Sequence, residues 1–220
     1  MNESQAREEI CRIGKSLFDR GYVHAAAGNI SARLDDGFLI TPTDAPLGFL
    51  DPAQLAKVDL AGRQVSGAMA SKTLALHSAI YRAALPFDGG TRCIVHTHSA
   101  HSVALSLRCE EPELLPPITP YFVMKVGHVP VLRYQRPGAP ATAEEVAGTI
   151  TRYGEAGRPI RAVMLQRLGP NVWHDTPAAA MAVLEELEET ARLMLLAQGP
   201  CSALTEPQID ELRRSFNARW

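Results

Sequence analysis

The hydrophobic pattern of this chain changes about halfway along its length, and the change limits the folds that the chain can adopt. Residues 29–41 and 56–67 each contain two short strand patterns around a tight turn, the first turn being at Asp36-Gly37. Later, short apolar runs at 93–98 and 161–168 alternate with segments of helical periodicity. Hairpins followed by alternating strands and helices predict a layered α/β or α+β domain around a mixed sheet.

Helical spacing and capping residues mark the remaining elements. In residues 3–20, Ile10, Ile13 and Leu17 recur at the spacing of one helix face, and Gly21 follows as a natural end. Further helices are expected at 72–85, 100–108, 141–153, from Pro177 to about Gln198, and from about Thr205 onward, with another strand at 129–134.

Length and composition describe an ordinary globular chain. Its 220 residues suffice for one domain, its net charge is -2, and 46% of its residues are hydrophobic. We therefore expect no nucleic-acid partner and no membrane partner, because there is no broad basic surface and no run of about 20 apolar residues. The N-terminus lacks the apolar core of a signal peptide, so a cytoplasmic location is expected.

The segment RCIVHTHSAH, residues 92–101, places three histidines after a short apolar run. If residues 93–98 form a strand, His96 and His98 project from the same side, and two imidazoles at this spacing can bind one metal ion. A catalytic zinc commonly has three protein ligands, so the pair alone is an incomplete site, and an isolated pair is more often structural. We expect His101 to pack or to support a ligand by a hydrogen bond.

Three short segments carry hydroxyl, amide, lysine and backbone N–H groups, a combination that favours an oxyanion such as phosphate. Each segment also has a structural explanation, as a turn or as a helix cap. The candidate residues are Gly28, Asn29, Thr43, Asp44, Ser71 and Lys72.

Taken in order, GNIS, TPTD, SKTLALHSAIYRA, VHTHSAHSVALS, PPITPYFVMKVG and EELEETARL resemble the class II aldolase/adducin family over most of the chain. The resemblance is closest to the branch that contains sugar-phosphate aldolases and 3-oxo-tetronate 4-phosphate decarboxylases. It implies a single three-layer αβα domain over residues 1–220, with a central mixed, largely antiparallel sheet. It also implies a homotetramer with active sites between subunits and a divalent metal, most often Zn²⁺.

The resemblance implies roles for individual residues of a metal-dependent lyase that acts on a phosphorylated sugar acid. His96 and His98 match the first two metal ligands, and Tyr121 matches a tyrosine that donates a proton in an aldolase relative. The six candidate anion-binding residues match the family's phosphate loops.

The sequence departs from the family pattern at three positions. Thr73 stands where the family has an acidic residue, Leu168 replaces the third metal-binding histidine, and Asp44 replaces a glycine of the phosphate loop. A carboxylate beside a phosphate repels it unless Lys72 or a metal compensates. His174, six residues after Leu168, is a candidate replacement ligand, with His101 and His128 as others.

These departures leave two alternatives to a metal-dependent decarboxylase or aldolase. The chain could be a diverged member of the family without lyase activity, serving as a binding or structural subunit. It could instead be an enzyme of altered chemistry without a tightly held metal, for which Lys72 and Lys125 are candidate polar groups.

Overall fold

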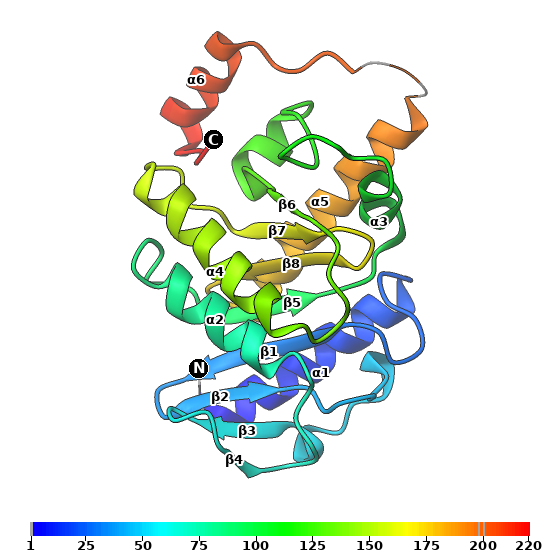
Figure 1. The fold of residues 1–220 in the computed structure, drawn as a ribbon, viewed down its shortest axis with the longest axis vertical. Coiled ribbons are helices and arrows are strands. Elements are labelled where there is room, and N and C mark those ends of the chain that lie inside the picture. The colour runs from blue at the N-terminus through cyan, green and yellow to red at the C-terminus, as the bar shows by residue number, and fades with distance from the viewer. Residues whose placement is uncertain (1, 198, 200) are drawn as a thin grey trace.

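The computed structural model describes residues 2–197, 199 and 201–220, and it confirms an α/β fold built on one mixed sheet (Figure 1). Eight strands follow the order β4-β3-β2-β1-β5-β8-β7-β6, and every neighbouring pair is antiparallel except β6 with β7. The strands are β1 (Asn29–Leu34), β2 (Gly37–Ile40), β3 (Ala56–Asp59), β4 (Gln64–Ser66), β5 (Cys93–His96), β6 (Val131–Leu132), β7 (Ala162–Leu165) and β8 (Gly169–His174).

Helices cover both faces of the sheet. They are α1 (Glu3–Asp19), α2 (Leu74–Ala84), α3 (Ala100–Ser106), α4 (Pro140–Glu155), α5 (Pro177–Leu196) and α6 (Glu206–Phe216), with 3₁₀ turns η1 (Leu47–Phe49) and η2 (Pro52–Gln54) and a π-helix η3 (Phe122–Val126). In Figure 1, α2 and α4 lie together on the near face, and α1 and α5 lie behind the sheet. Within the described residues, no helix is long and apolar enough to cross a membrane.

The alternation of side chains along β5 decides which face carries its histidine. Val95 belongs to the core that α1 and α5 close, whereas Ile94 belongs to the core that α2 and α4 close. His96 follows Ile94 by two residues, so it lies on the α2 and α4 face, at the end of the strand. His96 therefore lies at the edge of the core that α2 and α4 close.

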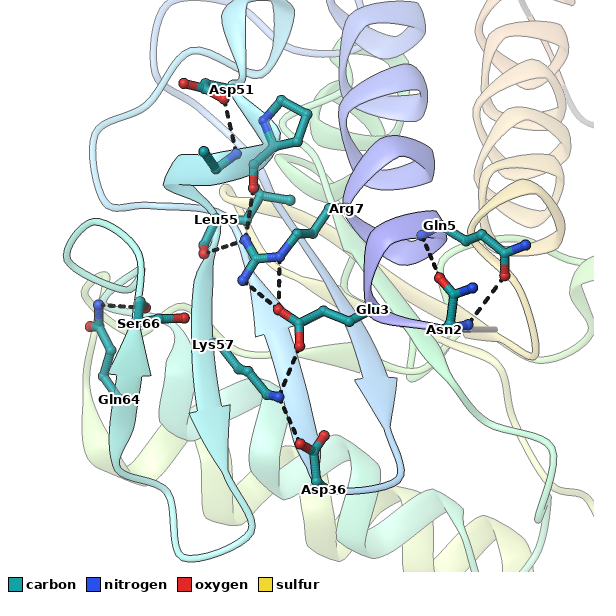
Figure 2. A network of polar contacts seen from close by, with 12 residues as sticks. Asn2, Glu3, Gln5, Arg7, Asp36, Asp51, Leu55, Lys57, Gln64 and Ser66 are labelled. Atoms are coloured by element: carbon teal, nitrogen blue, oxygen red, sulfur yellow. Dashed lines mark hydrogen bonds and ion pairs between the residues drawn. The ribbon is translucent and has the colours of Figure 1, made fainter.

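A network of charges fixes the start of α1 against the first half of the sheet (Figure 2). Lys57 of β3 contacts Glu3 at 2.9 Å and Asp36 of the β1–β2 turn at 2.6 Å. Arg7 donates to Glu3 and also to the carbonyl oxygens of Pro52 and Leu55. These contacts connect α1 to the β1–β2 hairpin, to β3 and to the η2 loop.

The structure differs from the expected elements in several places, and the strands expected at 129–134 and 161–168 are shorter, at Val131–Leu132 and Ala162–Leu165. The two-residue turn between β1 and β2 is Asp35-Asp36, because Gly37 already pairs with Leu34 and lies so close to β3 that a Cβ would meet the Val58 carbonyl oxygen at 1.9 Å. Strand β5 ends at His96, two residues earlier than expected. The π-helix η3 and strand β8 were not expected, and the expected helix end near Gln198 lies outside the described residues, with α5 ending at Leu196.

Candidate functional site

A cavity of about 470 Å³ opens where six parts of the chain meet. These are the loop before β1, the loop after β2, the loop before α2, the end of β5, the loop before α4, and the β7–β8 turn. The structure brings ten of the residues that the sequence singled out to this one cavity: Gly28, Asn29, Thr43, Asp44, Ser71, Lys72, Thr73, His96, His98 and Leu168.

Gly28 allows the loop before β1 to approach β5 closely. Its φ of 85° lies in the left-handed region, and a Cβ would meet the carbonyl oxygen of His96 at 2.9 Å. The next residue, Asn29, pairs with His96 across the β1–β5 ladder. This register places a buried amide, only 6% exposed, beside the histidine at the cavity wall.

The loops after β2 and before α2 are held together by backbone contacts. A short bridge joins Pro42 to Ala70, and the N–H of Ser71 donates to the carbonyl oxygen of Thr41. Lys72 lies 3.7 Å from Asp44, with both side chains exposed. Asp44 has a φ of 55°, which is the backbone reason for a glycine at this place in the family pattern, and aspartate tolerates it better than most residues.

Thr73 faces the cavity at the N-terminus of α2. Its hydroxyl lies 2.9 Å from that of Ser71, and it makes no capping bond to the helix. A threonine hydroxyl stays protonated at neutral pH, so it supplies hydrogen bonds but no general base.

His96 and His98 lie with their ring centres 5.0 Å apart, although only His96 belongs to the strand. Nδ1 of His96 donates to the Pro170 carbonyl oxygen at 2.9 Å. Burial, together with nearby His98, lowers the pKa of His96 to about 4, so the ring is neutral at physiological pH and its Nε2 keeps a lone pair. Burial, and secondly His24, lower the pKa of His98.

Two imidazoles in this arrangement fit two positions of one metal ion, since ligand bonds of about 2.1 Å place the centres of neighbouring rings roughly 5 Å apart. The third position does not fit. Leu168 lines the cavity where the family resemblance implies a histidine, and a hydrocarbon side chain has no lone pair. Within residues 2–197, 199 and 201–220, no three His, Cys, Asp or Glu side chains are grouped so that they could hold a metal ion.

The structure does not bring the candidate replacement histidines to the cavity. His174 pairs with Cys93 at the opposite end of β5 from His96, and its ring contacts Arg161 and Asp175. His101 bonds Glu188, and His128 bonds Glu113. The donor set therefore does not match the three-ligand site that the resemblance implies.

Two other predicted residues lie outside the cavity wall. Tyr121 immediately precedes η3 with 61% of its surface exposed, and Lys125 lies within η3. Neither residue lines the cavity of its own chain.

Sequence reasoning missed two residues, one in the cavity wall and one beside His98. Arg136 lines the cavity from the loop before α4, far along the sequence from the phosphate-loop segments. His24 lies with its ring centre 6.4 Å from that of His98. The proline and glycine around Arg136 indicated a loop, but no periodicity connected either residue to the site.

Residues 8–195 match the family model described as the class II aldolase and adducin N-terminal domain. A 3-oxo-tetronate 4-phosphate decarboxylase from Cupriavidus necator is 52% identical over 225 residues, covering 99% of each chain. The enzyme of the same name from Escherichia coli K12 is 40% identical over 217 residues, covering 96% of each chain.

Solved structures agree with this relationship. YgbL from Klebsiella pneumoniae superposes with a TM-score of 0.86 at 41% identity, covering 97% of this chain and all of that one. An L-fuculose 1-phosphate aldolase superposes with a TM-score of 0.82 at 23% identity, covering 99% of this chain and 98% of that one, which shows a shared fold. The chain belongs to the class II aldolase and adducin N-terminal domain family.

Proposed function

We propose that this chain is a carbon–carbon lyase that decarboxylates a phosphorylated 3-oxo sugar acid, as the names of its Cupriavidus necator and Escherichia coli relatives state for those proteins. The observation that carries the choice of decarboxylation over aldol cleavage is Thr73 at the cavity wall. We further propose that residues 1–220 act as one domain of a cytoplasmic homo-oligomer.

The two reactions differ in their need for a base. Aldol cleavage begins when a base removes the proton of a hydroxyl group, and the family's acidic residue suits that step. A 3-oxo acid is already ionised at neutral pH, and no proton has to leave before carbon dioxide does. Thr73 in place of a carboxylate therefore favours decarboxylation over a base-dependent cleavage.

The phosphate is assigned to the loops around Asn29, Ser71 and Lys72. An amide, a hydroxyl and an ammonium group in the cavity wall provide donors and positive charge for an oxyanion. Asp44 opposes this charge, and Lys72 lies close enough to Asp44 to offset part of the repulsion.

Bond cleavage moves an electron pair from the departing carboxylate carbon to the neighbouring carbon, forming an enolate whose charge lies on the 3-oxo oxygen. Arg136 lines the same cavity and is the arginine in its wall, so we assign to it the stabilisation of that oxygen. A proton then bonds to the carbon that lost carbon dioxide, which completes the reaction.

Tyr121 is assigned as the donor of that proton, acting in the site of a neighbouring subunit. Its exposure, and its position outside the cavity of its own chain, support a role across a subunit boundary. The family resemblance supplies both the role of the tyrosine and the expectation of a tetramer.

Comparing two substrates tests the proposal. Purified protein is incubated with 3-oxo-tetronate 4-phosphate, with release of carbon dioxide as the readout, and with L-fuculose 1-phosphate, with release of aldehyde as the readout. We expect carbon dioxide from the first and no aldehyde from the second. Cleavage of L-fuculose 1-phosphate at a comparable rate would contradict the assignment made from Thr73.

A matched pair of lysine variants tests the phosphate assignment. Lys72→Ala should lower kcat/KM by roughly tenfold or more, because a charge-assisted contact is lost. Lys15→Ala removes an exposed lysine from α1, where it pairs with Asp19, and should leave kcat/KM within about twofold.

The second candidate is a family member that binds a phosphorylated ligand without cleaving it. It is favoured by the joint replacement, at Thr73 and Leu168, of two groups that the family uses in catalysis. Saturable phosphate binding without turnover of either substrate would select it.

A further inference from the structure

Four polar side chains form a buried chain behind the cavity. Tyr81 Oη lies 2.9 Å from Ser31 Oγ, which lies 2.7 Å from Nδ1 of His77, and Nε2 of His77 lies 2.6 Å from Oδ1 of Asn29. Ser31 and His77 are fully buried, and Tyr81 and Asn29 are nearly so. Only Asn29, at the end of this chain, lines the cavity.

The hydrogens of this chain can point in only two consistent directions. Burial lowers the pKa of His77 to about 3, so the ring is neutral and carries a single N–H. In the first direction, Tyr81 donates to Ser31, Ser31 donates to Nδ1, and Nε2 donates to Oδ1 of Asn29. In the second direction, every donor and acceptor is exchanged and the amide of Asn29 is turned over.

Distances favour the first direction. It places every hydrogen on a contact of 2.9 Å or less. The second direction sends the Tyr81 hydroxyl hydrogen to the carbonyl oxygen of Arg92, which is 3.4 Å away and at the limit of a hydrogen bond. A buried hydroxyl favours the direction in which its donor is better satisfied.

The direction of the chain determines what Asn29 presents to a ligand. With Oδ1 bonded to His77, the NH₂ group is the part of the amide that is free for the cavity. An amide NH₂ is a donor, and a phosphate at neutral pH offers mainly acceptors. A reversed amide would instead present an oxygen and repel the anion.

We propose that His77, supported by Ser31 and Tyr81, is a positioning residue that holds Asn29 with its NH₂ group toward the cavity and so makes the site selective for an oxyanion. The inference rests on the proposed role of Asn29 in phosphate binding. It assigns to His77, which is fully buried, a role in orienting the ligand in addition to its packing in α2.

A double-mutant cycle on purified full-length protein tests this role, with the dissociation constant of inorganic phosphate measured by calorimetry. His77→Leu should weaken phosphate binding roughly fivefold to tenfold, the loss expected for one oriented hydrogen bond. In an Asn29→Ala background, His77→Leu should have almost no further effect. A histidine that served only for packing would weaken binding equally in both backgrounds, and that result would overturn the inference.

Two milder variants keep the test decisive if leucine prevents folding. His77→Gln can donate to Asn29 and accept from Ser31, so it should restore phosphate affinity to within about threefold of the native protein. Tyr81→Phe keeps the ring but removes the hydroxyl that sets the direction, and it should weaken binding severalfold. Wild-type affinity in Tyr81→Phe together with weak binding in His77→Gln would contradict the proposed series of hydrogen bonds from Tyr81 to Asn29.

Failure of the underlying assignment gives a different pattern. If Asn29→Ala binds phosphate as well as the native protein does, the phosphate role of Asn29 is wrong. If Asn29→Ala binds weakly but the His77 variants bind normally, only the positioning role is wrong.

Discussion

Leu168 separates this chain from the metal chemistry that its family resemblance implies. His96 retains the arrangement of a metal ligand, since Nδ1 donates to a backbone carbonyl oxygen and Nε2 keeps its lone pair. His98 lies at a suitable distance, and the residue at the third position is a hydrocarbon. One substitution therefore distinguishes a two-nitrogen site from a three-nitrogen site.

Leu168→Ala and Leu168→His make this difference measurable. We expect native protein and Leu168→Ala to lose zinc during dialysis against a weak chelator, and Leu168→His to retain close to one ion per chain, because a third imidazole strengthens binding by orders of magnitude. Elemental analysis of the dialysed proteins is the measurement. Retention of one ion by the native protein would show that another group, such as His24 after a side-chain rotation, completes the site.

His77 gives a second prediction at the residue scale, for stability against pH. Its pKa is about 3 in the folded chain, against about 6.5 when unfolded, so between these values the unfolded state binds the extra proton. The contribution of neutral His77 to the free energy of unfolding is complete above about pH 6.5. It declines as the pH falls, by at most about 1.4 kcal/mol per pH unit.

Urea unfolding at pH 7.0, 6.0 and 5.0 measures this decline, because most carboxylates stay ionised over that interval. We expect His77→Gln to show a shallower loss of stability than the native protein, since glutamine does not titrate. Equal slopes in the two proteins would contradict the buried, neutral state of His77.

Helix α3 shows how one element fixes the loop that carries His98. Glu188 of α5 accepts from the backbone N–H groups of His101 and Ser102 at 2.7 and 2.9 Å, and also from both of their side chains. A carboxylate at a helix N-terminus bonds free N–H groups and interacts favourably with the helix dipole. Glu188 therefore holds the start of α3 against α5, just after His96 and His98 in the sequence.

Glu188→Ala should destabilise the protein by about 2–4 kcal/mol, because it leaves buried donors without an acceptor. Its neighbour Glu189 is half-exposed and pairs with Arg192 on the same helix, so Glu189→Ala is the matched control, with an expected loss below about 1 kcal/mol. Urea unfolding compares the two variants. Similar losses would mean that Glu188 contributes no more than a surface ion pair.

The elements that sequence patterns predicted are those whose periodicity is local. Spacing of apolar residues identified α1 and α2, Pro177 marked the start of α5, and a short apolar run identified the strand that ends at His96. Strand β8 escaped prediction because Gly169 and Pro170 normally interrupt strands, yet here the Pro170 carbonyl oxygen accepts from His96. Arg136 and His24 reach the site through loops, whose course depends on tertiary contacts rather than on any pattern.

At the scale of the whole molecule, the position of Tyr121 outside the cavity lining of its own chain leads to a prediction about assembly. If the site forms between subunits of a symmetric oligomer, each site takes Asn29 from one subunit and Tyr121 from the partner subunit. The family resemblance implies four subunits, so light scattering on the purified protein should report a tetramer.

Mixing two inactive variants tests the shared site directly. Asn29→Ala and Tyr121→Phe proteins are each expected to lose most decarboxylase activity, because each lacks one of the two groups in every site. After joint refolding of equal amounts, random assembly gives about a quarter of the sites both native groups, so activity should return to about a quarter of the native value. Each variant refolded alone is the control. If the mixture stays as inactive as the separate variants, Tyr121 does not act across the subunit boundary, and the proton must come from a group within the chain that holds the cavity.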